Sequence, residues 1–439
     1  MRTNNAPVQR SLIRSSFLTT SLSSAAALVV TSVSGILLAR ILGPEARGEY
    51  GMILMIGQTV AAIGTFSFFE GAIVVIRQKD HEARDLLPTI ALGALLLTFA
   101  TAATMLLFFL VNPGLQTVGL TEFYLLAVLI VIANSISNTF STVERAQMAF
   151  NLVNLSRLLA PTIFSALLLC LWLFGYDRSS TLLVLILFLL AKLPFLIFWI
   201  TKYIRSLIGP VNYLTARDVW TTGMRLHFAA VLALLSGQID RLFGIGIWPS
   251  DVLGQYFVAF SVVGAGYSVV TTAIRTVIFP YFSGLSGTDR VTKLARLLRV
   301  TVLSSLAIFL LGAIIVPVAV PLVYGQAFAP ASDYAFMLLF SMAVVPLQVS
   351  VLETHRSRGR GMATTIMSLA PIAAMLTGFW ITGYGEPEEL IIAFGAANGL
   401  SAFVGILLLV RAGELHSLRA LVPGMEDLEL AIDLLLRRR

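Results

Sequence analysis

Cysteine, lysine and histidine are scarce in this chain of 439 residues. The one cysteine, Cys170, excludes an intrachain disulfide and is predicted to be a small core residue of an apolar segment. The four histidines are scattered and no two aspartates stand two residues apart, so the sequence favours no metal site. None of the lysines lies in a Gly-x-x-x-x-Gly-Lys-Ser/Thr motif, which excludes a P-loop. We therefore expect no catalytic residues and no cofactor.

Charge is also sparse, at 12% of residues, whereas 57% are hydrophobic and the mean hydropathy is +0.89. One soluble core could not bury this much apolar surface, so the chain is expected to lie in a bilayer. Mostly apolar stretches long enough to span it lie at 17–38, 50–76, 86–111, 122–147, 155–174, 181–201, 219–247, 254–281, 298–323, 333–353, 361–383 and 389–410. The sequence predicts an all-α integral membrane protein with about twelve transmembrane helices.

Basic residues alternate between the connections. They gather before the first span, in every second connection and in the C-terminal tail, whereas the connections between hold only Arg40, Arg47 and Arg178. Because basic residues remain on the cytoplasmic side in short loops, both termini are predicted to be cytoplasmic. Topology and anionic membrane lipids account for the formal charge of +7, and we infer no nucleic-acid partner from it.

Two halves of the chain resemble each other. The segment 43–50 returns 206 residues later as 249–256, with an acid, a glycine and a tyrosine in register, and the run 159–161 reappears at 369–371. Internal repeats in a membrane chain are typical of transporters, whose substrate sites lie between the halves. This predicts two six-helix repeats.

The repeat gives the domain organisation. The predicted parts are an N-terminal six-helix lobe at 1–201, a cytoplasmic linker at 202–218, a C-terminal six-helix lobe at 219–411 and a cytoplasmic tail at 412–439. In the linker, Gly209 and Pro210 break a helix, and Thr215 to Asp218 form a capping box that is predicted to open the seventh span. The tail is predicted to be an interfacial helix or a solvated segment.

Six charged side chains fall clearly inside predicted spans. They are Lys192, Arg225, Arg241, Arg275, Glu70 and Asp240. Each costs about 2.5–3.5 kcal/mol if it faces hydrocarbon, so they are expected to line water or form pairs. Arg225, Arg275 and Glu70 share one depth near the cytoplasmic side. We therefore predict a hydrated vestibule lined by the two arginines, with Glu70 as charge partner or proton carrier.

The other intramembrane charges are less constrained. Asp240 is expected to face the same direction as Arg225 but nearer the outer leaflet. Arg241 either pairs across a helix or reaches the cavity wall, and Lys192 either snorkels inward or contributes to the cavity. Glu144 and Glu353 stand at cytoplasmic span ends beside basic residues and are expected to form solvated ion pairs.

The intramembrane charges sum to +2, so the cavity is predicted to prefer an anion. A phosphate diester or diphosphate would suit the arginine forks, which bind phosphate bidentately, while its lipid tail remained in the bilayer. An inside-negative potential favours outward transfer of such a head group by about 2.3 kcal/mol per charge per 100 mV, so ATP is not required.

Two motifs carry a family resemblance. The run Leu37 to Glu45 is followed by Gly48-x-Tyr50, and the run Gln238 to Leu242 is followed by Gly254-x-Tyr256. With twelve spans, the chain resembles the polysaccharide transporters, the Wzx-type O-antigen and exopolysaccharide flippases of the multidrug/oligosaccharidyl-lipid/polysaccharide exporter superfamily. The resemblance implies a MATE/MOP-like fold and outward flipping of undecaprenyl-diphosphate-linked oligosaccharides by alternating access in the bacterial inner membrane. Among the site residues, it extends only to Asp240 and Arg241.

The resemblance also implies partners and alternatives. Beyond the lipid-linked oligosaccharide and membrane lipids, a polysaccharide polymerase and glycosyltransferases, which would take part in lipopolysaccharide or exopolysaccharide synthesis, are the expected partners. A multidrug antiporter of the same superfamily would need a more acidic or aromatic cavity. A membrane-embedded polymerase or ligase would need a large external loop, which the sequence lacks. A cell-wall precursor flippase resembling the MurJ type would usually add two spans.

Overall fold

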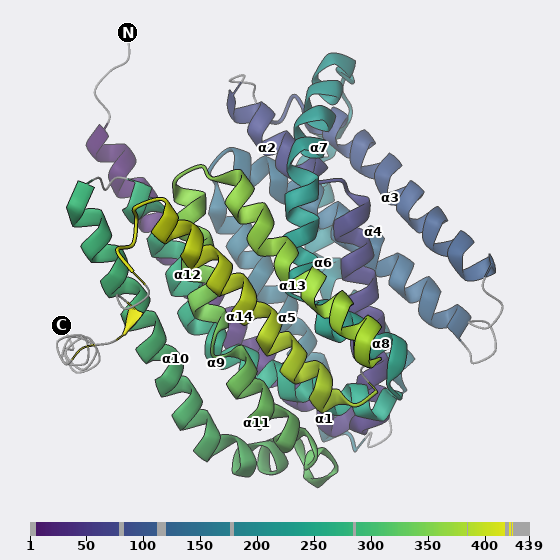
Figure 1. The fold of residues 1–439 in the computed structure, drawn as a ribbon. Helices are drawn as coiled ribbons and strands as arrows, with labels where there is room; N and C mark the ends of the chain where they lie inside the picture. Colours follow the sequence, from purple (N-terminus) through teal and green to yellow (C-terminus); the bar gives the residue numbers. More distant parts are fainter. Residues whose placement is uncertain are drawn as a thin grey trace. The chain divides into compact units, whose positions relative to one another are not determined.

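The computed structural model describes residues 6–78, 83–111, 120–175, 180–283, 287–383, 385–417, 421–422 and 424. Within these ranges the chain is helical and contains no strand. The helices, shown in Figure 1, are α1 (Ala6–Gly64), α2 (Phe68–Gln78), α3 (Leu87–Val111), α4 (Leu120–Ala146), α5 (Phe150–Leu173), α6 (Thr181–Leu207), α7 (Tyr213–Ser236), α8 (Ile239–Ile247), α9 (Ser250–Ser283), α10 (Gly287–Tyr324), the short 3₁₀ helix η2 (Gln326–Phe328), α11 (Ala331–Met342), α12 (Val345–Ser357), α13 (Gly361–Thr382) and α14 (Pro387–Arg411).

Eleven helical stretches in the described part of the chain are long and apolar enough to cross a membrane. The first of them, Ser23–Gly64, holds two predicted spans because its backbone leaves the helical region at Gly43. The eleven stretches therefore account for all twelve predicted spans, and the prediction of an all-α multi-pass membrane protein is confirmed. The orientation of the termini stays a prediction.

The turn inside α1 explains part of the first family motif. Gly43 has φ 72°, which favours glycine, and Pro44 opens the second arm of α1, where its missing N–H is no loss. Arg157 of α5 contacts Ser24 on the first arm and lines a cavity with Thr65, just past the second arm. Because positions 24 and 65 lie near the same residue, the two arms run antiparallel.

Three of the predicted spans are interrupted helices. The second span breaks at residues 65–67, between α1 and α2; the seventh breaks at 237–238, between α7 and α8; and the tenth breaks at 343–344, between α11 and α12. Non-helical backbone at membrane depth is tolerated where protein or a water-filled cavity surrounds it. Such breaks are therefore places to look for a substrate site.

The chain divides into two compact units, Met1–Val231 and Leu232–Arg439, with the division inside α7. The predicted linker at 202–218 is largely helical, since α6 continues to Leu207 and α7 begins at Tyr213. The capping-box prediction at Thr215 is wrong by one turn: the Asn212 side chain accepts a hydrogen bond from the Thr215 N–H at 3.0 Å and caps α7. The proposed lobe boundaries themselves stay a prediction.

Each unit buries its own apolar clusters. In the first unit, Ile41, Ile130 and Leu185 belong to a core shared by α1, α4, α5 and α6. In the second unit, residues of α9, α10, α12, α13 and α14 form a corresponding core. Large apolar side chains such as Phe99, at 74% exposure, remain on the helix surfaces, as expected for helices whose solvent is lipid. Cys170 is also exposed on α5, so its predicted core position is wrong: it lies on this apolar outer surface.

Helix α2 meets α7 through two glycines. A Cβ atom added to Gly71 would lie 2.5 Å from the Val219 carbonyl oxygen and 2.7 Å from the Gly223 nitrogen. A Cβ at Gly223 would lie 2.9 Å from the Ser67 carbonyl oxygen. Because the obstructing atoms are backbone atoms, they cannot move aside without shifting a helix.

We therefore expect Gly71→Ala to lower the free energy of unfolding by about 1–3 kcal/mol, the usual cost of overpacking. Gly35→Ala in α1, where an added Cβ meets nothing within 4 Å, is the matched control and should be neutral or slightly stabilising. Denaturant titration of the purified protein measures both. Equal stability of the two variants would contradict the close approach of α2 and α7.

A buried ionic cluster lies in the second unit. Glu414, just after α14, accepts hydrogen bonds from Arg290 Nε at 2.8 Å, Arg358 Nε at 2.9 Å and Arg360 Nη2 at 2.9 Å. Arg290 is only 1% exposed. Burial alone would raise the pKa of the Glu414 carboxyl, but the charge of Arg290 and the hydrogen bonds from Arg358 and Arg290 outweigh it, so this pKa lies below its usual value. The cluster joins α10, the α12–α13 connection and the end of α14.

Candidate functional site

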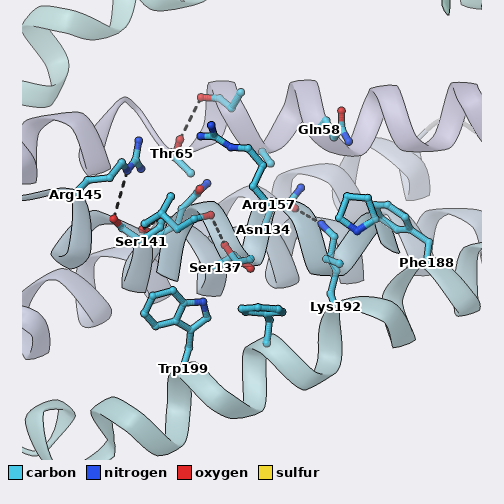
Figure 2. Close-up of a pocket in the computed structure, with 18 residues that line it drawn as sticks. Gln58, Thr65, Asn134, Ser137, Ser141, Arg145, Arg157, Phe188, Lys192 and Trp199 are labelled. Atoms are coloured by element: carbon cyan, nitrogen blue, oxygen red, sulfur yellow. Dashed lines mark hydrogen bonds between the residues drawn. The ribbon is translucent and has the colours of Figure 1, made fainter. Parts of the chain in front are cut away.

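The first unit contains a cavity of about 560 Å³ beside the break in the second span. Figure 2 shows the side chains that line it, from the end of α1 and from α4, α5 and α6. The polar lining residues are Gln58, Thr65, Asn134, Ser137, Asn138, Ser141, Arg145, Ser156, Arg157 and Lys192, and the aromatic ones are Phe188, Phe195 and Trp199. Amide and hydroxyl groups in this number can hydrogen-bond a polar, hydroxyl-rich ligand.

Three cations surround this cavity, and the described lining includes no carboxylate. Arg145 Nε donates to the Ser141 carbonyl at 3.4 Å, and Arg157 Nη1 donates to Ser24 Oγ at 3.2 Å. Lys192 Nζ donates to Asn134 Oδ1 at 2.6 Å and lies 4.7 Å from the centre of the Phe188 ring. Each cation thus has neutral polar contacts, so the cavity attracts anions.

Glu144, the acid next to Arg145 in the sequence, pairs with residues outside the cavity lining. Glu144 is 3% exposed and accepts hydrogen bonds from Lys202 and the Tyr203 hydroxyl. The predicted ion pair is therefore present, but its carboxylate is buried rather than solvated. The Tyr203 ring also stacks on Trp199, with ring centres 6.0 Å apart, so the same cluster holds one wall of the cavity in place. Glu353 likewise pairs with Arg356 at 3.0 Å and is buried.

Glu70 does not line the cavity, and its side chain has no hydrogen bond or ion pair with another residue that the structure describes. It is exposed on the first turn of α2 and interacts electrostatically with Arg145 of α4 and with His227 of α7. The sequence-based hypothesis gave it Arg225 and Arg275 as neighbouring cations. The structure brings Glu70 into the range of a different cation, Arg145.

Lys192 is the predicted binding residue that lines this cavity, and its contact with Asn134 favours the cavity alternative over inward snorkelling. Arg225 on α7, in the first unit, and Arg275 on α9, in the second, are both exposed. Neither has a hydrogen bond or ion pair with any residue that the structure describes. Their shared vestibule stays a prediction.

Asp240 and Arg241 form a compact group within the second unit. Asp240 is fully buried, and its Oδ2 accepts a hydrogen bond from the Tyr256 hydroxyl at 2.7 Å. Arg241 Nε lies 3.6 Å from Asp240 Oδ1, and its guanidinium lies 3.9 Å from the centre of the Phe260 ring. The second family motif is thereby explained, because its aspartate and its tyrosine join the start of α8 to α9.

The second unit has a cavity of similar size, about 630 Å³, but of different chemistry. It lies between α10, the α11–α12 break and α14, and its described lining includes Phe309, Phe340 and Leu347 and no charged residue. At the repeat offset of 209 residues, Lys192 corresponds to Ser401, which donates to the Met367 carbonyl at 2.6 Å. The basic lining of the first unit's cavity is therefore not repeated in this cavity of the second unit.

Sequence reasoning missed Arg145 and Arg157, because both were assigned to a cytoplasmic connection by their place between two apolar stretches. A detectable signal was present. In the fourth span, Asn134, Asn138, Ser141 and Arg145 recur at helical spacing along one face of the second half of α4. Such a polar stripe on a transmembrane helix indicates a face that meets water or a ligand.

The fold and this polar cavity define a membrane protein of the MOP-superfamily transporter fold. An inward-facing multidrug resistance MATE transporter is 14% identical, with a TM-score of 0.65 over 87% of this chain and 93% of that chain. The lipid II flippase MurJ in an inward closed conformation is 14% identical, with a TM-score of 0.66 over 95% and 91%. A MOP superfamily transporter from Pyrococcus furiosus, described as having a binding pocket of reverse polarity, is 14% identical, with a TM-score of 0.57 over 90% of this chain and 94% of that chain.

The sequence profile of a family described as polysaccharide biosynthesis protein matches residues 37–333. The chain belongs to this polysaccharide biosynthesis protein family. Among curated protein sequences none matches significantly. The predicted family and the predicted fold are thus confirmed, and the family and the structural neighbours are transporters and flippases rather than enzymes.

Proposed function

We propose that this protein flips a lipid-linked, anionic oligosaccharide across the membrane by alternating access, and that the cavity of the first unit holds its head group. The observation that carries the proposal is the set of Arg145, Arg157 and Lys192 around one polar cavity whose described lining has no carboxylate. Guanidinium groups bind phosphate oxygens bidentately, and the surrounding amides and hydroxyls suit sugar hydroxyls.

The lipid tail supplies the reason for a membrane cavity. Undecaprenyl diphosphate carries its sugar on a charged head group. Only this head group needs a polar route across the membrane, because the lipid tail can remain in the bilayer. The family membership of the chain supports a substrate of polysaccharide synthesis. The structural neighbour MurJ, described as a lipid II flippase, supports a lipid-linked substrate. Arg225, Arg275 and Arg241 stay proposed as further contacts for the head group.

A multidrug antiporter with this fold would have to hold cations. The three positive charges around the cavity disfavour a cationic drug there, because like charges repel most strongly where water is limited. We further propose the bacterial inner membrane as the location. A polysaccharide polymerase and glycosyltransferases, for O-antigen or exopolysaccharide, are the proposed partners.

The proposed function is tested by binding to the purified protein in detergent. Undecaprenyl diphosphate is expected to bind with an affinity that falls as the salt concentration is raised. The cationic dye ethidium should not bind at the same site and should not displace undecaprenyl diphosphate. In proteoliposomes, an undecaprenyl-diphosphate-linked sugar should then move between leaflets without ATP. Tight ethidium binding that undecaprenyl diphosphate cannot displace would favour drug transport and contradict the proposal.

A further inference from the structure

The turn between α12 and α13 holds two arginines, Arg358 and Arg360, side by side. Gly359 between them has φ 66°, which favours glycine. The backbone N–H groups of the two arginines both donate to the His355 carbonyl at 3.1 Å. Their side chains also meet at one atom, because each donates to Glu414 Oε1 at 2.9 Å. The two guanidinium groups are therefore neighbours, held by a tight turn and by a shared carboxylate oxygen.

The ionic cluster around Glu414 carries more positive charge than its acid can neutralise. The two turn arginines and Arg290 share this one carboxylate, so three positive charges against one negative charge leave an excess of +2. Glu353, an acid near the end of α12, pairs with Arg356 at 3.0 Å and does not reduce this excess. Because like charges that share a partner repel one another, a further anion would stabilise the cluster.

The two turn arginines retain donors for such an anion. Each guanidinium is a fork of several N–H groups, and the contacts with Glu414 use only Nε of Arg358 and Nη2 of Arg360. Nη1 of Arg360 is buried and has no hydrogen-bond partner among the residues that the structure describes. A buried donor without an acceptor is costly, so this nitrogen favours a bound ligand. The two side chains are 39% and 32% exposed, which leaves a ligand access to them.

The ionic cluster lies where helices leave the apolar part of the membrane. Arg290 begins one membrane-spanning stretch, the turn follows a stretch that ends at Ser357, and Glu414 follows a stretch that ends at Arg411. The distribution of basic residues predicts that these ends are cytoplasmic. The ends of spans lie at the level of the lipid head groups, and basic pockets between helices on this side bind anionic head groups such as that of cardiolipin.

We propose that the ionic cluster binds the head group of an anionic phospholipid with two phosphodiester groups, as in cardiolipin, through Arg358 and Arg360. The excess of two positive charges matches the two phosphates. Guanidinium forks bind phosphate oxygens bidentately, and Glu414 holds both forks in position. The lipid thereby holds the α12–α13 turn against the end of α14. The inference is independent of the proposed function, because it concerns the second unit and an ordinary membrane lipid.

Binding of fluorescent cardiolipin to the purified full-length protein in detergent tests this site. The double variant Arg358→Gln with Arg360→Gln is expected to bind cardiolipin at least about tenfold more weakly, because it loses two charge-assisted contacts. Glu414 keeps Arg290 as its partner in this variant, so no unpaired carboxylate is created.

A charge-matched control separates the site from the general positive charge of the protein. Arg205→Gln with Arg217→Gln removes the same charge from exposed helix ends in the first unit and should change the affinity by less than about twofold. Equal affinity of the two double variants for cardiolipin would overturn the proposal.

Two competitors identify the source of the phosphate. Phosphatidylcholine with the same acyl chains should compete poorly, because its head group has no net charge. Inorganic phosphate should also compete poorly, because it has no acyl chains to remain in the detergent micelle. Competition by phosphatidylcholine as strong as that by unlabelled cardiolipin would show that the acyl chains alone hold the lipid. Displacement by inorganic phosphate at the same concentration would show a site for soluble anions. Either result would overturn the proposal.

A second measurement uses only the native protein, so it decides the proposal even if the double variant fails to fold. A cardiolipin with a photoactivatable diazirine in its head group is irradiated with the protein in liposomes, and cross-linked peptides are identified by mass spectrometry. We expect cross-links within residues 356–361 and 411–415, and an excess of unlabelled cardiolipin should remove them. Cross-links that lie only elsewhere in the chain would refute the site.

Discussion

Neutralising both arginines of the basic cavity, by Arg145→Gln and Arg157→Gln together, is expected to weaken binding of undecaprenyl diphosphate by roughly 100- to 10,000-fold. Each hydrogen bond to a charged group contributes about 1.5–3 kcal/mol, and every 1.4 kcal/mol is about a factor of ten. Membrane insertion should be unaffected, because both side chains face the cavity rather than the buried core. Binding calorimetry and surface-polysaccharide export measure the two consequences.

Charge-matched controls separate this site from a general electrostatic effect. Arg217→Gln with Arg411→Gln removes the same charge from exposed positions away from the cavity and should leave binding within a few fold. The double variant Arg225→Gln with Arg275→Gln tests the vestibule predicted from the sequence. If that vestibule binds the head group, this double variant should also abolish export. Full binding in the Arg145 and Arg157 double variant, with loss in the Arg225 and Arg275 variant, would move the site to the vestibule.

Removing the charge at the centre of the ionic cluster, by Glu414→Gln, is expected to lower the free energy of unfolding by about 3–5 kcal/mol. The substitution takes the carboxylate partner from Arg290, which is only 1% exposed and cannot recover it from water. Glu353→Gln is the matched control, because its partner Arg356 has a side chain that is 57% exposed. The control should cost clearly less than Glu414→Gln, because the exposed Arg356 side chain is solvated by water when its partner is neutral, whereas Arg290 is not.

The effect of Glu414→Gln also has a predictable pH dependence. The carboxyl pKa is lowered in the folded protein, so the charged form adds stability above the unfolded pKa, and this contribution is lost as pH falls through the folded pKa. The difference in unfolding free energy between native protein and Glu414→Gln should be full at pH 7 and shrink below about pH 4. Denaturant titrations at several pH values measure it. A difference that grew on acidification would contradict the ion cluster.

Much of the fold could be predicted from the sequence, because a helix that crosses a lipid bilayer needs about 20 mostly apolar residues in a row, and such runs are easy to recognise. Every predicted span is helical in the structure, although three of the spans are interrupted. The breaks inside the second, seventh and tenth spans were not predicted. Phe66 and Ser67 lie inside an apolar stretch that reads as one continuous span, and their conformation depends on contacts with α7 that sequence periodicity does not record.

The site was predicted less well for a related reason. Lys192, which lines the candidate cavity, was proposed from the sequence because a lysine in an apolar run has to reach water or a partner. Arg145 and Arg157 were assigned to a loop, although the ends of α4 and α5 extend far enough to bring them around the same cavity. A charge at a span end cannot be assigned to solvent or to a cavity from its position alone, because that depends on which neighbouring helix covers it.

Site-specific protection tests the placement of the head group most directly. In a Cys170→Ser background, which removes the exposed native thiol, one variant carries Ser141→Cys in the basic cavity and another carries Ala396→Cys in the apolar cavity of the second unit. Labelling by N-ethylmaleimide is timed with and without an undecaprenyl-diphosphate-linked sugar. We predict that the lipid-linked sugar slows labelling at position 141 and leaves position 396 unchanged. Unchanged labelling at position 141, at lipid concentrations that saturate binding, would contradict the account.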